Sequence, residues 1–151
     1  MDLKVTLVQT DLFWENKNSN LEHVSGMLEN LDTTDLILLP EMFSTGFTMN
    51  AGHLAEDMAG QTVSWMADKA SELDAVVAGS LIVRENGCFY NRFVWAGPDR
   101  KLQWYNKKHL FSMGGEDRYY TPGKERVTLE WRGWKIRLMI CYDLQIGRAH
   151  V

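Results

Sequence analysis

A cysteine, a glutamate and a lysine each lie next to a short apolar or aromatic segment of this sequence. Cys141 directly follows the apolar run 138–140. Glu41 follows a similar run, 36–39, and one proline, and Lys107 lies between aromatic and apolar residues. A thiolate can attack a carbonyl carbon, a carboxylate can take and return the proton, and an ammonium can stabilise the developing oxyanion. Together these groups are the parts of an amidase that uses a thiol nucleophile.

Each of these residues also has an ordinary structural explanation. A free cysteine often packs as a small hydrophobic residue, a glutamate after a proline can begin a solvated loop, and most lysines lie on the surface. The position of Cys141 favours chemistry, because α/β sheets hold their ligand sites at the ends of strands. Cys88 directly follows a hairpin turn, and we interpret it as structural. Lys108 is the alternative to Lys107 for the ammonium.

The composition is that of one globular domain with a hydrophobic core. The chain has 151 residues, of which 45% are hydrophobic and 24% are charged. A net charge of −4, without long Lys or Arg runs, argues against a nucleic-acid or membrane surface. No apolar run has the length of a membrane span, and the N-terminus carries charges where a signal peptide would be apolar. Two cysteines form no disulfide framework, so we expect a reducing, cytoplasmic setting.

The hydrophobic periodicity predicts the order β-α-β-α-β followed by hairpins. We expect strands over 3–9, 36–39, 75–83, 88–96, 101–105, 127–131 and 134–141, helices over 18–31 and 61–73, and long loops over 42–60 and 106–126. The dipeptide Asn86-Gly87 predicts a hairpin, since it supplies the positive φ of a tight turn. Helices between apolar strands indicate one α/β domain with a mixed sheet that helices cover on its outer face.

Three motifs together resemble the carbon–nitrogen hydrolases of the nitrilase superfamily. They are Pro-Glu-Met-Phe at 40–43, Lys-Lys-His-Leu-Phe at 107–111 and Cys-Tyr-Asp at 141–143. The resemblance runs from the first strand to Leu144. It implies an α-β-β-α sandwich, a homodimer, a small-molecule amide as substrate and no cofactor.

The resemblance also implies roles for the three reactive residues. Cys141 is expected to be the nucleophile, Glu41 the general base and Lys107 the oxyanion stabiliser. The family pattern places its lysine two residues before the histidine, which selects Lys107. We expect the backbone N–H of Tyr142 to be a second oxyanion donor, and Asp143 to position neighbouring groups rather than transfer protons.

A second glutamate and two phenylalanines complete the expected site. Members of the superfamily often use a second glutamate, and Glu116 is the nearest match, with Asp117 and Glu125 close by in the sequence. Phe43 and Phe47 follow the general base and are candidates for the substrate pocket. Plain core packing is an equally good explanation of both.

The segments 41–49 and 131–134 resemble those of bacterial omega-amidases, which hydrolyse the terminal amide of 2-oxo acids such as 2-oxoglutaramate and 2-oxosuccinamate. An N-carbamoyl-amino-acid hydrolase or a nitrilase would use the same three reactive residues. A non-catalytic scaffold with an inert Cys141 is the alternative from another class. A nucleophilic Cys141 should have a lowered pKa and react quickly with thiol reagents. A metal site of His53, Glu56 and Asp57 lacks the usual ligand spacing, and we discount it.

The last seven residues depart from the family pattern. The segment 145–151 resembles the translation of a sequencing adapter. We therefore expect residues 1–144 to be the N-terminal part of a single hydrolase domain and residues 145–151 to be a non-native tail. The 151-residue chain on its own should then have negligible amidase activity, because an unpaired strand edge would be exposed.

Overall fold

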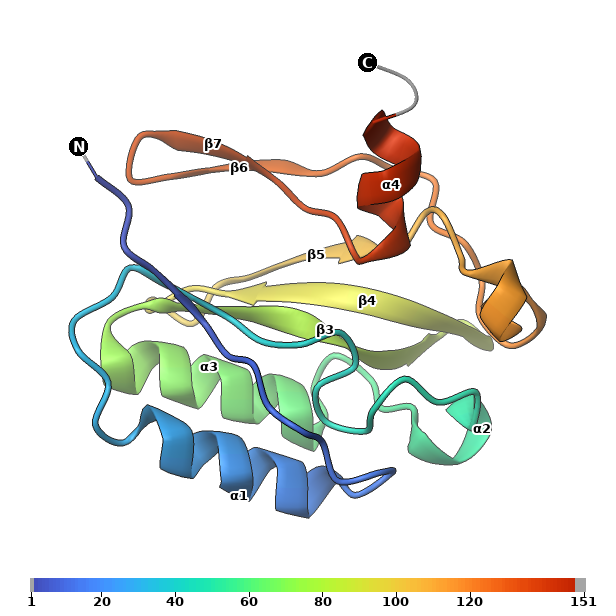
Figure 1. The fold of residues 1–151 in the computed structure, drawn as a ribbon, viewed down its shortest axis with the longest axis horizontal. Helices are drawn as coiled ribbons and strands as arrows, with labels where there is room; N and C mark the ends of the chain where they lie inside the picture. The colour runs from blue at the N-terminus through green and yellow to red at the C-terminus, as the bar shows by residue number, and fades with distance from the viewer. Residues whose placement is uncertain (1, 149–151) are drawn as a thin grey trace.

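A mixed five-stranded sheet is the centre of the fold, in the computed structural model that describes residues 2–148 (Figure 1). Its strands, in spatial order, are β1 (Val5–Leu7), β2 (Leu36–Leu38), β3 (Val76–Glu85), β4 (Cys88–Ala96) and β5 (Leu102–Asn106). Strands β1, β2 and β3 are parallel, whereas β3, β4 and β5 are antiparallel. The predicted α/β fold with a mixed sheet is confirmed.

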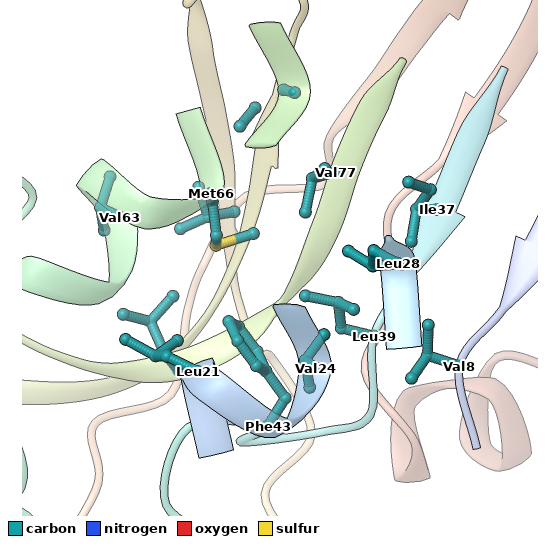
Figure 2. Close-up of a cluster of buried hydrophobic side chains, with 14 of the residues drawn as sticks. Val8, Leu21, Val24, Leu28, Ile37, Leu39, Phe43, Val63, Met66 and Val77 are labelled. Atoms are coloured by element: carbon teal, nitrogen blue, oxygen red, sulfur yellow. The ribbon is translucent and has the colours of Figure 1, made fainter. Parts of the chain in front are cut away.

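Two helices, α1 (Lys17–Leu28) and α3 (Gln61–Leu73), cover one face of this sheet (Figure 1). Helix α1 begins at Asn16, whose side chain accepts a hydrogen bond from the Ser19 N–H at 3.1 Å. Apolar side chains at helical spacing on both helices meet alternate residues of β2 and β3, as Figure 2 shows for Leu28, Met66 and Val77. The predicted helices 18–31 and 61–73 are therefore confirmed, with the first ending three residues early.

The opposite face of the sheet is covered by a hairpin of β6 (Thr128–Trp131) and β7 (Trp134–Arg137), followed by α4 (Tyr142–Arg148) (Figure 1). Leu129 of the hairpin packs against this face together with Leu138 and Ile140. Because side chains alternate along a strand, Leu36 and Val76 serve this second core while their neighbours serve the first.

The prediction of a strand from 134 to 141 is wrong beyond Arg137, where β7 ends. Leu138 and Ile140 are both buried, but they pack against the sheet face that the hairpin covers and do not extend the strand. Cys141 then lies in a turn with a φ of 44°, and α4 begins at the next residue. An apolar run indicates burial, and it does not distinguish a strand from a buried connection.

Shorter elements also depart from the prediction. Strand β1 spans three residues, and the predicted loops contain the short helices α2 (Ala51–Leu54), η1 (Ser112–Gly114) and η2 (Glu116–Arg118). Single helical turns contain too few residues to show a hydrophobic period. Of the predicted tail, residues 145–148 continue α4 and residues 149–151 lie outside the described residues, so its non-native origin stays a prediction. No helix within residues 2–148 is long and apolar enough to span a membrane.

Candidate active site

Glu41 is held at the end of β2 by its neighbour strand β3. The Leu39 N–H donates to the Ala78 carbonyl at 2.8 Å, and the Met42 N–H donates to the Ser80 hydroxyl at 2.9 Å. Met42 has a φ of 47°, an unusual conformation for a residue with a side chain. This tight turn directs the Glu41 side chain, which is 21% exposed, toward the end of β5.

Lys107 directly follows β5, and its ammonium is buried between two carboxylates. Its side chain is 1% exposed, and Nζ lies 2.7 Å from Glu41 Oε1 and 3.0 Å from Glu116 Oε2. The ring of Phe47 lies 5.5 Å from the same nitrogen. Burial opposes the charge on Lys107, but the hydrogen bonds and charges of the two glutamates outweigh it, and the pKa of Lys107 is raised. Lys107 is therefore a fixed cation. Lys108 forms no ion pair within residues 2–148.

Glu116 is fully buried at the start of η2, where the chain turns at Gly115 with a φ of 77°. Its Oε2 accepts a hydrogen bond from the Phe111 N–H at 2.7 Å in addition to the contact with Lys107. The neighbouring carboxylates of Asp117 and Glu125 are exposed. Of the three acidic residues considered for the second glutamate, Glu116 is the one that meets the lysine.

Asn91 is a member of the cluster that the sequence analysis missed. It lies on β4, is 1% exposed, and donates from Nδ2 to Glu41 Oε1 at 2.9 Å and to Glu116 Oε1 at 3.0 Å. The available signal was the polar pair Asn91-Arg92 in the middle of a predicted strand. Such a pair is costly to bury without partners, and here each residue has its own carboxylate partners.

Cys141 lies in the turn between the second core and α4, with its side chain exposed. Although the residue is exposed, neighbouring atoms partly desolvate its thiol, and this desolvation raises the pKa of Cys141. The charge and hydrogen bond of Glu41 raise it further. Lys107 and the backbone N–H of Tyr142 act in the opposite direction without reversing the result. The expectation of a lowered pKa is therefore wrong, because burial and then the nearby Glu41 carboxylate disfavour the thiolate. A thiol that keeps its proton at rest needs a base, and Glu41 is its neighbour.

Asp143 connects the cysteine turn to the lysine segment. It is 2% exposed and accepts hydrogen bonds from the His109 N–H at 2.8 Å, the Tyr105 hydroxyl at 2.8 Å and the Ile140 N–H at 3.0 Å. Burial, and then the bond to Asp143, raise the pKa of Tyr105. All these partners are structural groups, which agrees with the positioning role expected for Asp143.

A cavity of about 130 Å³ lies beside Cys141 and Glu41, and its walls include Phe93 and Met139, which the sequence analysis did not single out. Phe43 is fully buried in the helix-side core against Trp65, which leaves it no surface for a substrate (Figure 2).

Phe47 and Tyr142 lie at the edge of the cluster. Phe47 contacts the Lys107 ammonium, and the Tyr142 ring packs edge-on against Phe111 with centroids 5.5 Å apart. Their roles toward a substrate stay predictions.

Glu56, one of the residues considered for a metal site, stabilises the start of α3. Glu56 Oε1 accepts from the Thr62 N–H at 2.6 Å at the start of α3, and Glu56 Oε2 pairs with Lys17 at 3.0 Å. Within the described part of the chain, no three His, Cys, Asp or Glu side chains lie close enough together to hold a metal ion.

Comparisons with known proteins identify the family and agree with the fold. Residues 4–150 match the family described as carbon-nitrogen hydrolase. The chain is 42% identical over 145 residues to the omega-amidase YafV of Yersinia enterocolitica, covering 95% of this chain and 56% of the relative. It is 29% identical over 149 residues to the 2-oxoglutaramate amidase of Bacillus subtilis, covering 96% of this chain and 58% of the relative. The chain thus spans a little over half the length of these curated relatives.

Solved structures of carbon–nitrogen hydrolases have the same fold. The CN-hydrolase superfamily protein XC1258 of Xanthomonas campestris superposes with a TM-score of 0.93 at 42% identity, over 96% of this chain and 55% of that one. Nit3 of Saccharomyces cerevisiae, a nitrilase-superfamily member, shares the fold with a TM-score of 0.80 at 23% identity, over 95% of this chain and 56% of that one. With its family match over nearly the whole chain, this protein belongs to the carbon–nitrogen hydrolases of the nitrilase superfamily.

Proposed function

We propose that the complete protein hydrolyses the terminal amide of a small 2-oxo acid, of the 2-oxoglutaramate or 2-oxosuccinamate type, to the acid and ammonia. The observation that carries the proposal is the buried Lys107 ammonium between Glu41 and Glu116, next to the Cys141 turn. An ion-paired cluster of this kind has the base, the cation and the nucleophile that thiol-dependent amide hydrolysis needs. The omega-amidase and 2-oxoglutaramate amidase relatives support the choice of substrate class.

Acylation follows from the positions of these groups. Glu41 takes the proton of the Cys141 thiol as the sulfur attacks the amide carbonyl, and a C–S bond forms. The Lys107 ammonium and the Tyr142 N–H stabilise the negative charge on the carbonyl oxygen. When the C–N bond breaks, the departing amine takes its proton from Glu41 and leaves as ammonia. The acyl group remains as a thioester on Cys141.

Deacylation uses the same base. Glu41 takes a proton from a water molecule, and the resulting hydroxide attacks the thioester carbonyl. The C–S bond breaks, the acid leaves, and the proton on Glu41 returns to the sulfur. Glu116 keeps the Lys107 ammonium in place through both steps. A homodimeric assembly and a cytoplasmic location complete the proposal.

The test is ammonia release by the complete gene product and its variants. Cys141→Ala and Glu41→Gln should abolish turnover, because each removes a group that no neighbour replaces. Cys88→Ala is the matched control, since Cys88 begins β4 on the hairpin away from the cluster, and its activity should be unchanged. Appreciable turnover by Cys141→Ala would show that the thioester mechanism is wrong.

A substrate panel tests the substrate class. We expect ammonia release from 2-oxoglutaramate to exceed that from glutamine, asparagine or a simple nitrile. Preference for an N-carbamoyl amino acid or a nitrile would instead assign the protein to one of the alternatives. Lack of turnover on every substrate by a folded complete protein would favour the scaffold.

A further inference from the structure

Asn91 is the buried residue of the site whose own hydrogen bonding is incomplete. Its Nδ2 donates one hydrogen to Glu41 Oε1 and the other to Glu116 Oε1, so both amide hydrogens are used. Its Oδ1 has no hydrogen-bond partner within residues 2–148. Among the buried side-chain oxygens and nitrogens of these residues, it is the one without a partner. A buried acceptor without a partner carries a desolvation penalty, which something else in the site must offset.

The two carboxylates account for this orientation. With the amide turned around, Oδ1 would face oxygens of Glu41 and Glu116, which accept hydrogen bonds and cannot donate them when ionised. The observed orientation instead gives two charge-assisted hydrogen bonds, which are stronger than neutral ones. Asn91 therefore donates hydrogen bonds to both carboxylates, while its own side-chain oxygen is left without a partner.

Asn20 shows how a buried asparagine with a purely structural role is arranged in the same molecule. It is fully buried and donates to the carbonyls of Phe13 and Ser44 at 2.8 and 2.9 Å. Its Oδ1 accepts from the Phe13 N–H at 2.7 Å. Both ends of the amide are satisfied by the backbone, with no charged partner.

Asn91 and Lys107 bind the same oxygen of Glu41. Asn91 Nδ2 and Lys107 Nζ both contact Oε1, at 2.9 and 2.7 Å, which leaves Oε2 available to the thiol of Cys141. The charged and titratable groups around Asn91 are Glu41 after β2, Glu116 in η2, Lys107 after β5 and, beyond Glu41, Cys141 before α4. Two carboxylates and one ammonium give this group an excess of negative charge, and Asn91 supplies neutral donors to both carboxylates.

We infer that Asn91 is a positioning residue, which holds the Glu41 carboxylate with one oxygen turned to the thiol. The inference rests on the proposed role of Glu41 as the base. Without the Asn91 donors, the Glu41 carboxylate loses one of the two hydrogen bonds that fix its Oε1, so its free oxygen is no longer held toward the thiol. Proton transfer then becomes slower, whereas the substrate pocket is not altered.

The experiment compares Asn91→Leu with Asn20→Leu in the complete gene product. Asn91→Leu should lower kcat on 2-oxoglutaramate by about a hundredfold, the loss that a misplacement of about 1 Å can cause. KM should change little, because Asn91 holds the base and not the substrate. Asn20→Leu should lower the unfolding temperature and leave kcat and KM per folded molecule unchanged. Asn91→Ser, which keeps one donor, should fall between parent and Asn91→Leu, and it carries the test if Asn91→Leu does not fold.

The outcomes separate the inference from the proposed function. If Cys141→Ala and Glu41→Gln are inactive while folded Asn91 variants keep the parental kcat, the inference is overturned and the mechanism stands. A rise in KM as large as the fall in kcat also overturns it, because a residue that positions the base should change kcat alone. Activity in Glu41→Gln overturns the proposed function itself.

Discussion

Two cations are buried where the end of β5 pairs with the middle of β4, and they are neutralised in different ways. The guanidinium of Arg92 is fully buried and donates to both oxygens of Glu85, at 3.2 and 3.0 Å, and to Asn106 Oδ1 at 2.7 Å. The ammonium of Lys107 lies between two carboxylates, those of Glu41 and Glu116. The first group has one positive and one negative charge, whereas the second has one positive and two negative charges.

The difference separates a structural ion pair from a site suited to proton transfer. The hydrogen bond and charge of Arg92 lower the pKa of Glu85. The Glu85 side chain is also 44% exposed, so water helps to stabilise its charged form. The lysine cluster is buried, carries excess negative charge and lies beside a thiol whose pKa is raised. The Arg92–Glu85 pair is balanced, with one charge of each sign, and nothing in it favours uptake of a proton. The cluster of Lys107, Glu41 and Glu116 is unbalanced, with one more negative than positive charge, and it can accept the proton of Cys141.

The largest expected effect comes from removing the cation of the unbalanced cluster. Lys107→Met should lower kcat for ammonia release by about 10²–10³-fold or more, the size reported for loss of one oxyanion donor. Lys108→Met is the control, and it should keep the parental rate because Lys108 forms no ion pair within residues 2–148. Equal damage from both variants would show that the choice of lysine is wrong.

The next effect tests how Lys107 is held. The Gly123 N–H donates to the Lys107 carbonyl at 2.9 Å, and a Cβ on Gly123 would collide with the backbone oxygen of Asn106. Gly123→Ala should therefore displace the lysine and lower kcat by about a hundredfold, as a misplacement of about 1 Å can. Gly26→Ala in α1 meets no atom within 4 Å and should leave kcat unchanged. Steady-state kinetics on both variants would decide; parental kcat in Gly123→Ala would exclude this anchoring role.

Breaking the balanced pair should affect stability and leave catalysis intact. Arg92→Met removes the hydrogen bonds to Glu85 and Asn106, and we expect the free energy of unfolding to fall by about 1–3 kcal/mol. The cost stays moderate because Glu85 is partly exposed and can be rehydrated. Denaturant unfolding measures the change, and kcat per folded molecule should be parental. A folded Arg92→Met protein without activity would place Arg92 in the catalytic machinery.

The smallest expected effect is on the pH at which the Cys141 thiol ionises, and it tests how the charges of the lysine cluster act on the sulfur. In a Cys88→Ala background, the rate of Cys141 alkylation by iodoacetamide should rise with pH at a midpoint above that of an ordinary cysteine, because the thiolate is the reactive form. Glu41→Gln should move this midpoint to lower pH, and Lys107→Met should move it to higher pH. Glu85→Gln, from the balanced pair, should leave it unchanged. A midpoint below that of an ordinary cysteine would contradict the raised pKa.

Local patterns in the sequence determined the elements that carry the site. The apolar run 36–39 ended by a proline predicts a buried strand that delivers Glu41, and the structure has β2 there. The helical spacing of 61–73 and the Asn86-Gly87 turn are equally local signals, and both elements form as predicted. Such features depend on residues close in sequence, so propensity and periodicity are enough to find them.

The constellation itself depended on contacts between distant residues. Glu41 meets Asn91 and Lys107 across 50 and 66 positions of the chain, and Glu116 is distinguished from its acidic neighbours only by its complete burial. The pKa of Cys141 is raised and not lowered as predicted, because it depends on the burial of the thiol and on how near Glu41 and Lys107 approach the sulfur. The sequence by itself determined which groups are present and which strands and helices bear them. Only the tertiary structure decided their pairing, burial and charge balance, because electrostatic and desolvation energies depend on distances in space that no local pattern contains.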